Sequence, residues 1–112
     1  ALVRAEKLCR RIEKEGFEWP KAESFFEKTT DKITKLRIKL EKKTIPDELV
    51  EEEIGDILLS IVKLSIRLNI DPEISLRKSN KKFEQRFRLV ENKLSESGKI
   101  QLKTSLANYD IL

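Results

Sequence analysis

Two carboxylates near the middle of the chain, Glu53 and Asp56, have the types and the spacing that metal chemistry needs. They are three residues apart, so in a helix both side chains lie on one face, about one turn apart. Such a pair can share a hard cation such as Mg²⁺, but ExxD spacing also occurs by chance in many acidic helices. Residues 47–56 hold six acids and no base, and a strongly apolar stretch follows. The first question is therefore which cation faces these carboxylates.

A row of lysines offers one answer. Lys28, Lys32, Lys35 and Lys39 fall along one edge of the helix expected at about 21–43. If this helix and the next form an antiparallel hairpin, the lysine edge faces Glu53 and Asp56. A carboxylate that lies beside the core and has no cationic partner would carry a heavy desolvation cost. The residue types and their spacing therefore favour partly buried ion pairs over a metal site.

The composition narrows the possible chemistry. The chain has 112 residues, a net charge of +4, one cysteine and no histidine. A disulfide framework within the chain is excluded, and any metal or acid/base chemistry must use carboxylates and lysines. The single cysteine suits a reducing compartment, no apolar run is long enough to span a membrane, and the N-terminus lacks a signal-peptide core. We expect one soluble, cytoplasmic domain over residues 1–112.

The positions of the Gly and Pro residues predict an all-α fold. Only three Gly and three Pro are present, and they fall where helices should end or begin. The predicted helices cover about 2–15, 21–43, 46–68 and 72–95, with a short helix after about 104. Gly16 should end the first helix, while Asp71 and Pro72 should start the fourth. Short connections predict a small antiparallel bundle of four main helices plus the short C-terminal helix.

Each predicted helix has an apolar stripe that should face the core. The stripe on 21–43 contains Ala22, Phe25, Thr29, Ile33, Leu36 and Leu40, and the stripe on 46–68 contains Val50, Ile54, Ile57, Ile61, Leu64 and Leu68. On 72–95 the stripe contains Phe83, Phe87, Val90 and Leu94. Glu53 falls inside its stripe and Asp56 lies at the edge. Leu59 and Ile66 lie opposite the main stripe, and this excess suits a subunit interface.

Several motifs resemble the MazG-type nucleoside triphosphate pyrophosphohydrolase family. They are the turn `EEEIGD`, the helix break `RLNIDPE` and the run `NKKFEQRF`, together with the upstream `RAEKLCRRIEKEGFEW`. The match covers essentially the whole chain. The resemblance implies an all-α protein that forms a homodimer or a higher homo-oligomer, and that hydrolyses a nucleoside triphosphate to the monophosphate and pyrophosphate with Mg²⁺. Attack of water on a phosphoryl group needs a metal, a carboxylate and nearby cations, and none of this requires His or Cys.

The resemblance also assigns residues. Glu53 and Asp56 match the ExxD pair that binds metal and acts in catalysis, while Asn80, Lys82, Phe83 and Arg86 match positions in `NKKFEQRF`. Of these, Lys82 and Arg86 are the expected phosphate contacts, because they are one turn apart and can reach one oxyanion. Phe83 is expected in the core. Trp19 matches an aromatic at the first corner, where packing is favoured over base stacking.

The sequence departs from the family at its EExxE motif, which supplies the other half of the metal site. Aligned through `DKITKLRIKL`, the three acidic positions are Lys35, Leu36 and Lys39. Two ammonium groups beside Glu53 and Asp56 would repel Mg²⁺ and take its place in salt bridges. Two alternatives would supply the missing acidic ligands. One is a shifted metal site that uses Asp31 and Glu27, and the other is a second domain that contributes ligands in trans.

Three functions therefore compete. The first is a pyrophosphohydrolase domain whose activity is weak or lost. The second is a non-catalytic helical module for dimerisation or partner binding. The third is nucleic-acid binding. It is disfavoured because the Lys and Arg side chains of residues 77–88 are distributed around the helix and no aromatic stacking platform accompanies them. The ending `ANYDIL` stops inside an expected helical segment, which favours a fragment or a truncated tail of a longer protein.

Overall fold

The computed structural model describes residues 1–16 and 19–97, with side chains described as far as residue 93. Four helices account for nearly all of this part: α1 (Leu2–Lys14), α2 (Ala22–Glu41), α3 (Asp47–Arg67) and α4 (Pro72–Ser97). The all-α prediction is confirmed, and each helix boundary lies within two residues of its predicted place. The short helix expected after about 104 falls outside the described residues.

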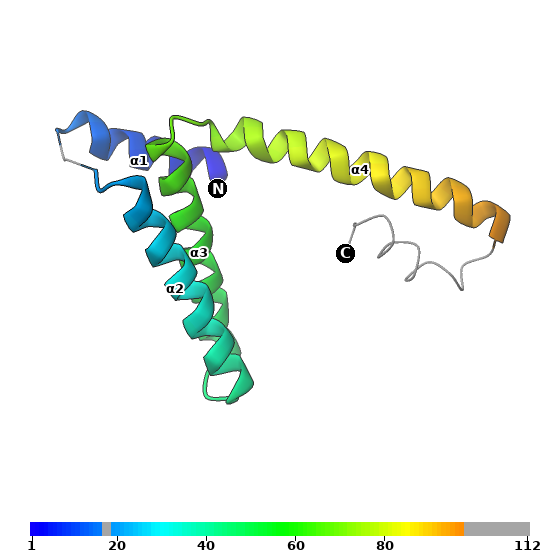
Figure 1. Cartoon of the computed structure of the whole chain (residues 1–112), viewed down its shortest axis with the longest axis horizontal. Coiled ribbons are helices and arrows are strands. Elements are labelled where there is room, and N and C mark those ends of the chain that lie inside the picture. Colours follow the sequence, from blue (N-terminus) through cyan, green and yellow to red (C-terminus); the bar gives the residue numbers. More distant parts are fainter. Residues whose placement is uncertain (17–18, 98–112) are drawn as a thin grey trace. The chain divides into compact units, whose positions relative to one another are not determined.

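The chain divides into two compact units, Ala1–Glu73 and Ile74–Leu112. In the first unit α2 and α3 run side by side as an antiparallel hairpin (Figure 1), and α3 also contacts α1. The helix α3 is therefore the centre of this unit and buries two different faces. The prediction of a single domain over 1–112 stays a prediction.

The core of the first unit lies where α1 meets α3. Cys9 of α1 packs with Val62 and Ile66 of α3, and Trp19 lies against this cluster. The Trp19 ring also contacts Phe25 at the start of α2, with 5.5 Å between the ring centroids and a 36° tilt. The expected packing role of Trp19 is confirmed. Arg67 Nε donates to the carbonyl oxygen of Pro20 over 2.9 Å, which ties the end of α3 to the segment before α2.

Local chemistry explains where the helices end and begin. Gly16 has φ +83, a conformation that strains residues with a Cβ, and it follows the last turn of α1. At α4, the backbone N–H of Glu73 donates to Asp71 Oδ1 over 2.9 Å, and Pro72 is the first helical residue. Both predicted signals, the glycine stop and the Asp–Pro start, are confirmed.

The apolar stripe predicted on α3 is only partly in the core. Val50, Ile57 and Leu64 are half-buried on the α2 side. Ile54, Ile61 and Leu68, which share the predicted stripe, remain 44 to 45% exposed. The prediction that Ile66 adds surface for an interface is wrong, because Ile66 is buried against Cys9. The wheel placed Ile66 opposite the α2 face correctly, but α1 covers that side.

The second unit contains most of α4. Val90 is fully buried, as predicted for the stripe of this helix, whereas Phe87 is 37% exposed. Phe83 is 54% exposed, so its expected core position is not found in the structure. The side chain of Leu94, the last member of the predicted stripe, lies outside the described residues. Among the described residues, no helix is both long and apolar enough to cross a membrane.

Candidate functional site

The hairpin of α2 and α3 brings a lysine onto the first predicted metal ligand. Lys39 Nζ lies 2.5 Å from Glu53 Oε1, and the two side chains are 46% and 27% exposed. An ammonium group at this distance donates to the carboxylate and supplies its counter-charge. The expectation that the lysine edge of α2 faces the acids of α3 is confirmed for this pair.

A second lysine contacts α3 two turns away. Lys32 Nζ donates to Ser60 Oγ over 2.9 Å, and Ser60 Oγ in turn donates to the carbonyl oxygen of Asp56 over 2.9 Å. Ser60 is buried, so its hydroxyl joins the lysine to the α3 backbone inside the helix contact. Sequence reasoning did not assign Ser60 a role. The sequence feature that could have indicated this role is that Ser60 is a polar residue on the apolar side of α3.

The other positions of the missing acidic motif behave differently from Lys39. Leu36 is buried in the α2–α3 contact. Lys35 faces solvent and lies 3.8 Å from Asp31 on its own helix, with both side chains more than 70% exposed. Of the two lysines expected beside Glu53 and Asp56, Lys39 is the one that contacts either of them within the described structure. Asp56 is exposed, and its carboxylate has no hydrogen-bond or ion-pair partner among the described residues.

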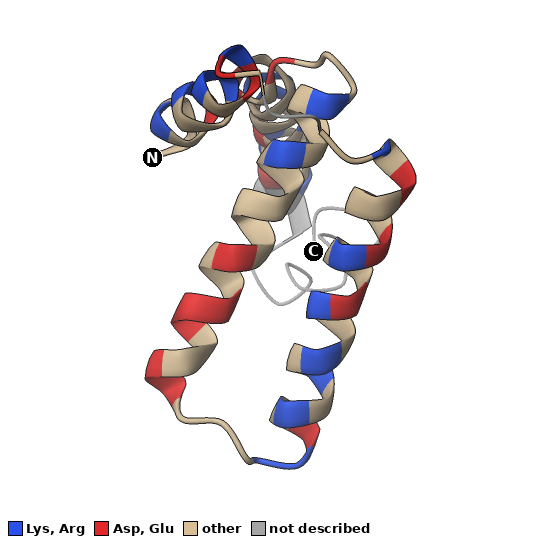
Figure 2. Ribbon diagram, turned by 90° about the vertical axis from the view of Figure 1, so that its left-hand side faces the viewer, with Lys and Arg blue, Asp and Glu red and all other residues tan. Residues whose placement is uncertain are grey.

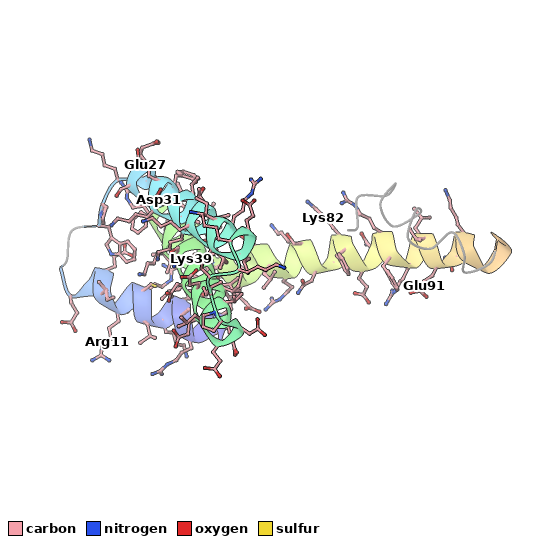
Figure 3. The ribbon with its side chains drawn as sticks, turned by 90° about the horizontal axis from the view of Figure 1, so that it is seen from below. Arg11, Glu27, Asp31, Lys39, Lys82 and Glu91 are labelled. Carbon is pink, nitrogen blue, oxygen red and sulfur yellow. The ribbon has the colours of Figure 1, made fainter. Side chains whose placement is uncertain are left out.

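Opposite charges line the two arms of the hairpin near its turn. Figure 2 shows acidic residues along the first part of α3 and mostly basic residues along the last part of α2. Glu27 and Asp31, the acids of the alternative shifted site, lie on the exposed side of α2 (Figure 3). In the described part of the chain, no group of three or more Asp, Glu, Cys or His residues could hold a metal ion. The cation that contacts Glu53 in the structure is the ammonium group of Lys39.

The predicted phosphate contacts lie on α4, in the second unit. Asn80, Lys82 and Arg86 are all exposed, and Lys82 projects from the helix in Figure 3. Lys82 and Arg86 are one turn apart, so their cationic groups can reach a common anion. Neighbouring Arg88 differs, because its guanidinium pairs with Glu84 one turn earlier.

The chain is similar in sequence to nucleoside triphosphate pyrophosphohydrolases of two bacteria. A nucleoside triphosphate pyrophosphohydrolase/pyrophosphatase MazG from Thermotoga maritima is 42% identical over 113 residues, which covers 97% of this chain and 42% of the relative. A nucleoside triphosphate pyrophosphohydrolase from Escherichia coli K12 is 35% identical over 98 residues, covering 88% of this chain and 37% of the relative. Over most of its length, the chain is therefore similar to MazG-type nucleoside triphosphate pyrophosphohydrolases. No family model matches it.

The MazG resemblance drawn from `EEEIGD`, `RLNIDPE` and `NKKFEQRF` is confirmed by these relatives. The chain spans about two fifths of the length of the relatives. The similarity covers both the hairpin and α4, so it includes the ExxD pair and the residues proposed to contact phosphate.

Proposed function

We propose that the chain is a MazG-type nucleoside triphosphate pyrophosphohydrolase domain whose own turnover is weak or lost. The names of its relatives support the reaction class, hydrolysis of a nucleoside triphosphate with release of pyrophosphate. The loss of turnover rests on one observation, the ion pair between Lys39 and Glu53. An ammonium group lies where a divalent cation would need a carboxylate ligand.

The residues of the hairpin do not fit a magnesium ion. Mg²⁺ prefers oxygen ligands in near-octahedral geometry and is usually held by carboxylates. Glu53 and Asp56 supply two, but the facing positions on α2 carry Lys32, Leu36 and Lys39, which offer no anionic oxygen. Two positive charges within reach of α3 would also raise the free energy of a nearby divalent cation. We therefore assign Glu53 to ion pairing, although its position is that of a metal ligand in the family motif.

Substrate binding remains part of the proposal without the metal. Lys82 and Arg86 provide adjacent cations for a triphosphate, and Asn80 offers an amide for a hydrogen bond. Nucleotide affinity that depends on Lys82 and Arg86 would then persist without turnover. A cytoplasmic location belongs to the same proposal, supported by a single cysteine that is free and buried.

Release of pyrophosphate from a panel of nucleoside triphosphates, with and without Mg²⁺ or Mn²⁺, tests this function. We expect turnover at or near the background of a Glu53→Gln/Asp56→Asn variant. Binding of a nucleoside triphosphate should weaken by about tenfold in a Lys82→Ala/Arg86→Ala variant, and should hold in a Lys7→Ala/Lys14→Ala control. Metal-dependent turnover that the Glu53→Gln/Asp56→Asn variant abolishes would overturn the proposed loss. No binding of any triphosphate would overturn the substrate assignment.

A second function is favoured by the amount of exposed apolar surface in the first unit. Half-exposed Ile and Leu side chains on α2 and α3 suit a non-catalytic module for dimerisation or partner binding. Assembly into a homodimer is compatible with both functions, so metal binding and turnover distinguish between them.

A further inference from the structure

Three cations lie in line along one side of α4. Lys78, Lys82 and Arg86 recur every four residues, so neighbouring side chains are one turn apart on the same side of the helix. All three are exposed, and none has a hydrogen-bond or ion-pair partner among the described residues. We call these three residues the cation row, of which Lys82 is labelled in Figure 3.

The cation row differs from the charge pattern of the other described helices. Elsewhere, several basic residues pair with an acid one turn away, as Arg10 does with Glu6 on α1. On α4 itself, Arg88 pairs in the same way with Glu84. Opposite charges one turn apart stabilise a helix, whereas like charges destabilise it. An anion bound along the cation row would therefore relieve a repulsion that the helix itself does not neutralise.

The acids of α4 lie on the other side of the helix. The described acidic side chains are those of Glu73, Glu84 and Glu91. At 100° per residue, each of them is about 120° or more away from every member of the cation row. An anion on the row therefore meets none of these carboxylates, and a divalent cation at the same place would find no ligand among them.

The cation row is limited to three members. The position one turn before Lys78 is Ile74, and the position one turn after Arg86 is Val90, which is fully buried. The row spans about 12 Å, since eight residues rise by about 1.5 Å each. A chain of three phosphate groups offers one charged group to each cation, whereas a nucleic-acid backbone would continue past both apolar ends. The length of the row therefore favours a triphosphate.

The charge of the row favours one form of this ligand. Mg²⁺ that coordinates a phosphate chain cancels part of its negative charge. Three cations without a nearby carboxylate attract the metal-free chain more strongly than its magnesium complex. A site that holds Mg²⁺ between carboxylates and phosphates has the opposite preference, because the metal joins the ligand to the protein.

We propose that Lys78 is a third phosphate contact, and that the cation row binds the phosphate chain of a metal-free triphosphate. The inference rests on the proposed function, which assigns Lys82 and Arg86 to phosphate. It adds the contact at Lys78, the length of the phosphate chain and the preference for the chain without a metal.

Isothermal titration calorimetry of the full 112-residue chain with ATP and with inorganic triphosphate, both in EDTA, tests the row. We expect Lys78→Ala to weaken the affinity for both ligands by about threefold, and Lys78→Arg to keep the wild-type affinity because it keeps the charge. Circular dichroism shows whether each variant is folded, and alanine at an exposed helix position favours the helix.

The matched control is Lys81→Ala. Lys81 is also an exposed lysine of α4 without a partner among the described residues, so the control makes the same change in net charge. It lies about 100° from Lys82 and about 140° from Arg86 around the helix, and its removal should change the affinity little. Equal losses of affinity in Lys78→Ala and Lys81→Ala would overturn the proposal.

A second titration compares ATP in EDTA with ATP in excess Mg²⁺. We expect binding to be about threefold weaker with Mg²⁺, and tighter binding with Mg²⁺ would overturn the proposal. A loss in Lys78→Ala for ATP but not for inorganic triphosphate would overturn it too, since Lys78 would then contact another part of the nucleotide.

The same titrations separate failure of the cation row from failure of the proposed function. ATP binding that needs Lys82 and Arg86 but not Lys78 would overturn the row and leave the substrate assignment. Binding of inorganic triphosphate without binding of any nucleoside triphosphate would overturn the substrate assignment and leave the row. Binding of neither ligand would overturn both.

Discussion

At the scale of single residues, the Lys39–Glu53 pair matters for charge more than for stability. Both partners are partly exposed, and exposed ion pairs contribute only about 0–1 kcal/mol to folding. The same pair supports the proposed loss of metal binding, because the Lys39 ammonium lies 2.5 Å from Glu53 Oε1 and supplies this carboxylate with a counter-charge. A change of one side chain on α2 therefore alters the chemistry of a carboxylate on α3 with little effect on the fold.

Titration of the Cys9 thiol is coupled to folding. Burial raises the pKa of the Cys9 thiol above its ordinary value, and the nearby charge of Lys63 opposes this rise. Because the folded state holds the thiol proton more tightly, this contribution to stability is complete below the ordinary pKa of about 8.5. It is lost as the pH rises through the pKa of the folded state.

We therefore predict that the stability difference between the wild type and Cys9→Ala narrows as the pH rises from 7 to 10. The variant loses buried volume at every pH, but it has no thiol proton to lose. Urea denaturation at several pH values measures both curves. Parallel curves over this range would contradict the assigned role of Cys9.

At the scale of helices, the hairpin shows which positions would rebuild a metal site. The alignment of the missing EExxE motif pointed to Lys35, Leu36 and Lys39. Leu36 is buried, so an acid there would damage the helix contact. Lys32 and Lys39 both reach α3, at Ser60 and Glu53, on either side of the level of Asp56. These two positions are the better sites for added carboxylates.

We predict that Lys32→Glu/Lys39→Glu binds Mg²⁺ at least tenfold more tightly than the wild type. The change removes two positive charges from the hairpin and places two carboxylates opposite Glu53 and Asp56. Isothermal titration calorimetry measures the affinity. The matched control, Lys28→Glu/Lys42→Glu, makes the same change in net charge farther from Asp56 and should gain little. Equal gains in both variants would show that net charge, not the site, controls binding.

Helix positions were predictable because their signals are local. Gly16, Asp71 and Pro72 act through their own backbone conformation and nearest hydrogen bonds, which the sequence contains in full. The sequence predicted that the lysine edge of α2 faces the acidic residues of α3. It did not predict the register of the two helices, which determines that Lys39 contacts Glu53. Register depends on how closely two helices approach, and that distance is set by packed side chains such as Leu36.

At the scale of the whole molecule, apolar periodicity shows which surfaces avoid water but not what covers them. Ile33, Leu40, Ile54, Ile61 and Leu68 were all predicted as core, and all five are half-exposed in the single chain. The reverse happened at Ile66, which was predicted as surface and is covered by α1. A helical wheel cannot distinguish a face buried by its own chain from one buried by a second copy.

If a second copy of the chain covers these half-exposed side chains, stability must depend on protein concentration. We predict that the melting temperature of the wild type rises by roughly 3 °C for each tenfold rise in protein concentration. Ile33 belongs to the predicted apolar stripe of α2 and is half-exposed, so the melting temperature of Ile33→Lys should be independent of concentration. Ile38 is similarly exposed but lies outside that stripe, so Ile38→Lys should behave as the wild type does. Calorimetric scans at three concentrations provide the measurement. A wild-type melting temperature that does not change with concentration would mean that a second copy contributes nothing to the stability of the fold.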